Sequence, residues 1–199
     1  MTKFRLSVII AVIILTVASF AADISAFAND CTELRKSVLR LHVVANSDSE
    51  ADQAVKLEVR DLLLKETENR IKDAEGKADI ERYFSENSEN IELLVEDFLK
   101  KRGFDYGAEV SLSHSYFETR EYNGNTLPSG DYDALKVTLG SGEGKNWWCV
   151  MFPPLCISAA DGDELPQKEY ALMQSGSKPS YKLKLKIVEI FRGIKRWFS

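Results

Sequence analysis

Thirteen residues in the C-terminal third constrain the fold of this chain most, and they read GKNWWCVMFPPLC from Gly144 to Cys156. They hold two of the three Trp, two of the three Cys and two of the five Pro. A disulfide between Cys149 and Cys156 needs Cα atoms within about 7 Å, whereas seven extended residues span roughly 23 Å. The chain must then turn back between them, and it can do so at Phe152, Pro153 and Pro154, because proline fixes φ and restricts the residue before it. The stretch is predicted to be a short strand that leads into a rigid loop.

The cysteines and tryptophans each leave two interpretations open. Three cysteines cannot all pair within one chain, so either Cys149 pairs with Cys156 and leaves Cys31 as a tether or spare thiol, or Cys31 pairs with one of them. Trp147 and Trp148 either form a stiff aromatic surface for a partner or fill a core from the two faces of a strand that starts at Asn146. The two roles of the tryptophans are compatible.

The N-terminus has the pattern of an export signal. Lys3 and Arg5 precede an uncharged run from Leu6 to Ala22, and a small-x-small site ends at Ala28. Residues 1–28 are therefore predicted to be a signal peptide, cleaved between Ala28 and Asn29, that leaves an exported domain of residues 29–180. An uncleaved membrane anchor is the alternative. In both cases the domain lies outside the cytoplasm, where disulfides can form.

Charge divides the chain into an acidic body and a basic tail. The net charge is −11 over residues 29–181 and +5 over residues 182–199. No basic face larger than this tail is visible, which argues against a nucleic-acid partner. Residues 181–199 are predicted to be a cationic amphipathic tail, a short strand passing into a helix, that lies on an anionic membrane surface. The apolar stripe of that helix comprises Leu183, Ile187, Ile190, Phe191, Ile194, Trp197 and Phe198.

The remaining periodicities predict an α+β domain in which an antiparallel sheet packs against two amphipathic helices. One helix is predicted to start with Ser47 as its cap and to end near Lys72, and the other to run from Ser85 or Ser88 to Gly103. His114 is predicted to be a core residue of its strand. The last two strands are predicted to pair across a glycine-rich turn. Strands are expected at residues 38–45, 108–122, 134–139 and 146–152.

The first helix divides into an apolar and a polar set. Its apolar positions predict one buried stripe that comprises Ala51, Val55, Val59 and Leu62. Its polar positions are predicted to face away from that stripe, and they are Asp52, Gln53, Lys56 and Arg60.

The sequence carries no pattern typical of a catalyst. His42 and His114 do not stand at a metal-binding spacing from each other or from a cysteine, so no metal or other cofactor is predicted. Cys149 would serve as the nucleophile of a cysteine hydrolase only as a free thiol with one of these histidines as base. No nucleotide fingerprint or small-molecule site is visible. The chain is therefore predicted to be a binding protein and not an enzyme.

Two blocks of this sequence resemble the stage II sporulation protein R family. The first runs from Arg40 to Ser49 and continues through Arg60. The second comprises residues 127–135 and the segment from Gly144 to Cys156. The similarity spans about Leu34 to Cys156, and the second block is the more specific of the two.

The resemblance implies a signalling protein of endospore formation. Members of this family are made in the forespore, exported into the space between the forespore and mother-cell membranes, and needed there to activate a membrane-embedded aspartic protease that processes a pro-sigma factor. A structural envelope protein is the alternative. The resemblance supplies no contact map, so the choice of partner-binding residues rests on physical grounds. They are Asn46, Asp48, Asp52, Gln53, Lys56, Arg60, Asn146, Trp147, Trp148, Phe152, Pro153 and Pro154.

Overall fold

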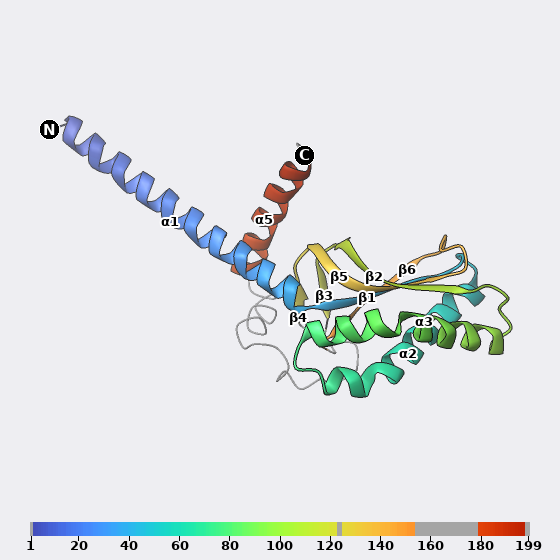
Figure 1. Cartoon of the computed structure of the whole chain (residues 1–199). Coiled ribbons are helices and arrows are strands. Elements are labelled where there is room, and N and C mark those ends of the chain that lie inside the picture. The colour runs from blue at the N-terminus through green and yellow to red at the C-terminus, as the bar shows by residue number, and fades with distance from the viewer. Residues whose placement is uncertain (1, 123–124, 154–178, 198–199) are drawn as a thin grey trace.

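The computed structural model of the chain describes residues 2–122, 125–153 and 179–197 (Figure 1). Within these residues it contains both helices and strands, in agreement with the predicted α+β class. In chain order they are α1 (Thr2–Ser37), β1 (Leu39–Val44), α2 (Glu50–Lys72), α3 (Lys77–Lys101), β2 (Ala108–Phe117), β3 (Arg120–Tyr122), β4 (Asn125–Leu127), β5 (Gly130–Leu139), β6 (Asn146–Phe152) and α5 (Pro179–Trp197).

The main sheet has the strand order β2-β5-β1-β6 and is mixed. β1 is parallel to β5 and antiparallel to β6, and β2 is antiparallel to β5. The predicted hairpin between the last two strands is therefore wrong, because β1 lies between them and Leu41 is in register with both Leu135 and Cys149. All six residues of β1 are buried. A strand that is buried on both faces takes a central place in a sheet, and β1 does so although Arg40 and His42 lie on one of its faces.

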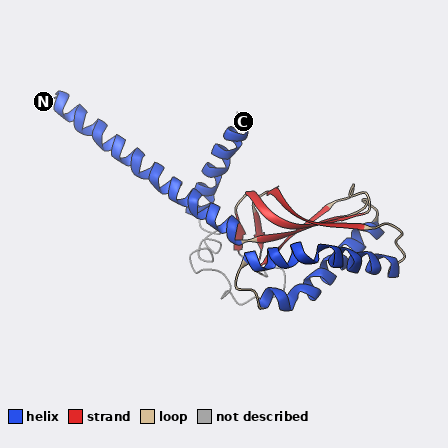
Figure 2. Ribbon diagram, in the orientation of Figure 1, coloured by secondary structure: helices blue, strands red, loops and turns tan. Residues whose placement is uncertain are grey.

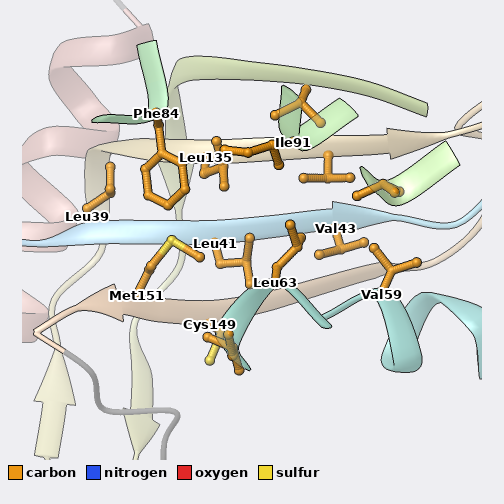
Figure 3. Packing of buried hydrophobic residues seen from close by; sticks show 14 of the residues in the cluster. Leu39, Leu41, Val43, Val59, Leu63, Phe84, Ile91, Leu135, Cys149 and Met151 are labelled. Atoms are coloured by element: carbon orange, nitrogen blue, oxygen red, sulfur yellow. The ribbon is translucent and has the colours of Figure 1, made fainter. Parts of the chain in front are cut away.

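Helices α2 and α3 cover one face of this sheet (Figure 2). The main core forms between these helices and the sheet. There Leu41 and Val43 of β1 meet Val59 and Leu63 of α2 and Phe84 of α3 (Figure 3). The opposite face carries a smaller cluster that joins the end of α1 to the sheet. This second cluster comprises Leu34, Val38, Phe117, Leu127, Tyr132, Ala134 and Val150.

The helices start at places other than those predicted. Ser49, and not Ser47, caps α2, and its side chain accepts a hydrogen bond from the backbone N–H of Asp52. Helix α3 begins at Lys77, about two turns before Ser85. Its apolar stripe extends back through two residues that the prediction left out, because Ile80 and Phe84 are buried in the core.

The buried stripe of α2 also differs from the prediction. Ala51 is exposed and Leu62 is only half-buried, whereas Asp52 and Lys56, which were predicted to face away from the core, are 6% and 4% exposed. The stripe therefore includes two charged residues in place of two apolar ones. Both have hydrogen-bond partners in other parts of the chain, as described below.

The prediction that His114 is a core residue is wrong. β2 is an edge strand of the sheet, and the imidazole of His114 is exposed and lies 2.8 Å from a carboxylate oxygen of Asp133. Of the face that the alternation along β2 predicted to be buried, only Val110 is covered, whereas Leu112 and Tyr116 are exposed like His114.

Helix α1 is continuous through the predicted cleavage site at Ala28 and Asn29. It is long and apolar enough from Lys3 to Ser37 to cross a membrane; its most apolar window has a mean hydropathy of 2.4 and is not buried in the protein. An apolar helix near the N-terminus also fits a signal sequence.

The C-terminal tail is helical throughout its described part, so the predicted short strand is wrong. Tyr181, Leu185 and Val188 of α5 pack against Phe27 and Cys31 of α1. Lys184 also forms an ion pair with Asp23 at 2.7 Å. The predicted apolar stripe lies on another side of α5, where its exposed members are Leu183, Ile190, Phe191, Ile194 and Trp197.

Candidate functional site

Two segments about a hundred residues apart in sequence meet where β1 ends and β6 begins. We call the structure that they form the junction, and it comprises residues 45–60 and 140–148. The backbone N–H of Gly144 donates to the carbonyl oxygen of Ala45 at 2.9 Å. The backbone N–H of Lys145 donates to Asp48 Oδ1 at 2.8 Å, and Lys56 Nζ donates to the Lys145 carbonyl oxygen at 3.0 Å. The helix start and the approach to the Trp pair therefore form one structure.

The close approach of the two segments requires glycine at position 144. A Cβ atom placed there would collide with the backbone carbonyl of Ser47, which cannot move without displacing the start of α2. Gly140 has φ +54, a left-handed conformation that favours glycine, and its backbone lies against the side chain of Asn46. The glycine-rich turn thus permits both the reversal of the chain and its contact with the β1–α2 loop.

Asp52 is the acceptor that holds the junction together. Its carboxylate accepts hydrogen bonds from Ser47 Oγ at 2.5 Å, Tyr106 Oη at 2.6 Å and Asn46 Nδ2 at 3.1 Å. Burial alone would raise the pKa of Asp52, but the hydrogen bonds from Ser47, Tyr106 and Asn46 hold it below its ordinary value. Burial in turn raises the pKa of the Tyr106 hydroxyl, so this group stays a donor. Asp52 therefore remains ionised inside the junction.

Two further polar residues of α2 act within the same network. Gln53 Nε2 donates to the carbonyl oxygen of Ser47 at 2.9 Å, and Lys56 Nζ donates to Gln53 Oε1 at 2.6 Å. Burial lowers the pKa of the Lys56 ammonium. These side chains fix the loops relative to α2, which is a positioning role.

The two tryptophans lie on opposite faces of the sheet, and each is half-buried. Trp147 packs against the main core, and the guanidinium of Arg60 lies 4.6 Å from its ring centroid. Trp148 stacks on His42 with 3.6 Å between ring centroids. His42 Nε2 also lies 2.7 Å from Asn146 Oδ1. Each tryptophan thus packs against a core cluster and stays partly exposed, so core packing is confirmed and the partner surface stays a prediction.

The proline end of the second block lies away from the junction. Phe152 is in register with Leu39, at the other end of β1, about 20 Å along the strand from Asn146. Phe152 and Pro153 are buried, whereas Pro154 lies outside the described residues. The twelve predicted partner-binding residues therefore do not form one surface.

The predicted disulfide cannot be placed, because Cys156 also lies outside the described residues. Cys149 is buried in the main core. Cys31 is a buried thiol in the cluster that joins α1 to α5, a position that argues against a surface tether.

The junction coincides with sequence that this chain shares with known proteins. Residues 35–161 match the family model described as stage II sporulation protein R, which covers well over half of the chain. This chain belongs to the stage II sporulation protein R family. The stage II sporulation protein R of Bacillus subtilis (strain 168) is 34% identical over 132 residues, which is 66% of this chain and 59% of that relative. The chain thus spans less than two thirds of the length of this relative. No solved structure matches the chain.

The name of the stage II sporulation protein R family refers to sporulation and names no enzymatic activity. In this member, Cys149 and His42 do not form a catalytic pair, because Cys149 belongs to the helix-covered face of the sheet and His42 points to the other face. His114 lies at the exposed edge strand. Within the described ranges, no three His, Cys, Asp or Glu side chains cluster as a metal site would require.

Sequence reasoning missed several residues of the site in this family member. Tyr106 and Ser141 lie in connecting segments without periodicity, and the pattern gave no signal that they contact Asp52 and Asn46.

Proposed function

We propose that this protein is an exported signalling protein of sporulation that activates a membrane-embedded aspartic protease in the mother cell and so triggers processing of a pro-sigma factor. Membership of the stage II sporulation protein R family supports the role in sporulation. The observation that carries the proposal is that parts of both sequence blocks, residues 45–60 and 144–148, meet in the junction. The catalytic aspartates belong to the partner, and this chain acts as its ligand.

A ligand shifts a partner towards an active state only by binding that state more tightly. The accessible residues of the junction offer such contacts, since Asp48 and Lys145 are exposed near the Arg60–Trp147 pair, and Asn146 is exposed with its side chain directed to His42 on the other face. Trp and Arg are the residue types that contribute most to protein interfaces. The internal hydrogen bonds of Asp52 and Lys56 keep this surface in one conformation, which reduces the entropy lost on docking.

The remaining predicted contact residues take other roles in this proposal. Asn46, Asp52, Gln53 and Lys56 position the junction from within. Phe152 and Pro153 direct the chain out of β6, and Trp148 belongs to the opposite face of the sheet. The predicted disulfide between Cys149 and Cys156 would stiffen the segment that follows.

The proposed location is the space between the forespore and mother-cell membranes. Cleavage between Ala28 and Asn29 would remove Phe27 and Asp23, two of the α1 residues that α5 contacts. An uncleaved α1 would keep this contact and anchor the domain at the forespore membrane. Mass spectrometry of the exported protein distinguishes the two forms.

Co-expression in a host that does not form spores tests the proposed function. The host carries the candidate protease and its pro-sigma substrate, and cleavage is followed by immunoblot with and without this chain. Cleavage that requires the chain supports the ligand role. Cleavage at the same rate without the chain, or in a protease variant lacking its catalytic aspartate, would contradict it.

The tail is proposed to lie on anionic lipid through the exposed apolar side of α5. Substituting both Phe191 and Trp197 by Ser is expected to weaken flotation of a chain starting at Asn29 with phosphatidylserine vesicles at least about a hundredfold, because each buried aromatic ring contributes about 1.5–3 kcal/mol. Tyr116→Ser removes an exposed ring of the main sheet and serves as the control. Unchanged flotation of the double variant would exclude α5 as the lipid-binding element.

A further inference from the structure

Arg40 is a fully buried cation that has no counter-charge among the described residues. Its side chain is 0% exposed, and no carboxylate pairs with it in the described part of the chain. Nε donates to the Cys149 carbonyl oxygen at 3.2 Å and Nη2 donates to Tyr122 Oη at 2.5 Å, whereas Nη1 has no hydrogen-bond partner in the described ranges. A buried charge costs several kcal/mol unless it is paired, so an unpaired one requires an explanation.

Aromatic rings compensate part of this cost. The guanidinium carbon of Arg40 lies 4.2 Å from the ring centroid of Phe117, 5.1 Å from that of Tyr132 and 5.5 Å from that of Tyr122. Such cation–π contacts stabilise a cation but leave its net charge in place. Burial lowers the pKa of the Arg40 guanidinium, as expected where the charge is not neutralised.

A cavity of about 260 Å³ lies beside this guanidinium. Arg120 adds a second positive charge to its lining, and Glu118 adds one negative charge. Both of these side chains are exposed, so they stand at the accessible part of the cavity. The aromatic part of the lining comes from Tyr116, Phe117 and Trp148.

We propose that this cavity binds a carboxylate attached to an apolar or aromatic group, such as the carboxylate of a peptide. The two arginines and one glutamate give the lining a formal charge of +1, which matches a carboxylate better than a phosphate with a charge near −2. Arg120 contacts the carboxylate directly, and the ligand's charge offsets that of Arg40 in a setting of low dielectric constant. The rings of Phe117 and Trp148 contact the apolar part of the ligand. This site does not depend on the proposed function, since Trp148 faces away from the Arg60–Trp147 side of the junction.

Titration of the full-length chain in detergent micelles with sodium phenylacetate tests the site. The indole N–H resonance of Trp148, assigned against those of Trp147 and Trp197, is expected to shift and saturate. Phenylacetamide has the same ring without the charge and is expected to leave the resonance in place. Inorganic phosphate is expected to bind at least about tenfold more weakly, because a doubly charged ion loses more hydration than one net positive charge offsets and has no apolar part to contact the rings.

Two exposed positions give effects of opposite sign without disturbing the core. Arg120→Gln is expected to weaken phenylacetate binding at least about tenfold, the size of a lost charge-assisted hydrogen bond. Glu118→Gln is expected to tighten it about two- to fivefold by removing a like charge. Arg82→Gln changes the net charge by the same amount on α3, away from the cavity, and is expected to have no effect.

Several outcomes would overturn the proposal. Equal shifts with phenylacetamide would make the cavity merely apolar, and tighter binding of phosphate would assign it to another anion. A response of Arg82→Gln equal to that of Arg120→Gln would mean that net charge alone governs binding. Absence of a saturable shift would exclude a carboxylate site.

Discussion

Replacing Asp52 by alanine is expected to lower the free energy of unfolding by about 3 kcal/mol or more, because it leaves the donors of Ser47, Asn46 and Tyr106 without their charged acceptor. The loss is measured by urea denaturation. Asp61→Ala provides the matched control, since Asp61 is an exposed carboxylate on the same helix, and it is expected to change stability by no more than about 0.5 kcal/mol. Equal losses in the two variants would mean that the hydrogen bonds of Asp52 do not stabilise the fold.

The contribution of Asp52 to stability is also expected to depend on pH. The hydrogen bonds place the folded-state pKa of Asp52 below its unfolded value of about 3.9, so its contribution is complete above about pH 4 and is lost as the pH falls through the folded-state pKa. Asp52→Asn is therefore expected to be less stable than the parent at neutral pH, and the difference is expected to narrow below about pH 4. A difference that stays constant down to pH 2 would contradict an ionised Asp52.

The double substitution Arg60→Ala with Asn146→Ala is expected to reduce cleavage of the pro-sigma factor in the co-expression assay by about ten- to a hundredfold. Arg60 covers the ring of Trp147, and Asn146 is exposed at the adjoining start of β6 with its side chain directed to His42, so both residues border the exposed part of the junction. A loss of about 1.4 kcal/mol of binding free energy reduces affinity tenfold. Exported protein levels and urea denaturation show whether the variant is folded.

The matched control for this pair lies on α3. Arg82→Ala with Asn90→Ala removes the same two side-chain types from exposed positions remote from the junction, and cleavage is expected to stay unchanged. Equal activity of the two double variants would exclude the junction as the docking surface.

Local periodicity predicted most elements of the fold and none of its long-range pairings. The apolar run of residues 38–45 and the stripe of Val95 and Leu99 each depend on neighbours in sequence, and the structure confirms them in β1 and α3. The identity of the two neighbours of β1, β5 and β6, depends on contacts about a hundred residues apart, which no local pattern encodes. The prediction of a strand in the tail was wrong for a related reason. Alternation over residues 182–187 fits a strand, but these residues form a helix that packs against α1.

The sequence predicted several residues of the candidate site, but it did not predict which of them are buried or which lie together in space. The sequence pattern predicted that Asp52 and Lys56 lie on the solvated face of a helix. Their hydrogen-bond partners include Tyr106 and the Lys145 carbonyl, which are distant in sequence and leave no local signal. Asp48 and Asn146 were predicted as partner-binding residues, and both are exposed. Phe152 was grouped with the tryptophans by sequence proximity, although a seven-residue strand carries it to the far end of the sheet.

Photocrosslinking from the junction tests the proposed ligand role most directly. A photoreactive amino acid is placed at Asn146, or at Asn90 of α3 as the control, and each variant is exported alongside the membrane-embedded protease. Light is expected to join the position-146 variant to the protease and to leave the position-90 variant unattached. If cleavage is active and position 146 yields no adduct with the protease, or both positions yield it equally, the junction is not where this protein meets its partner.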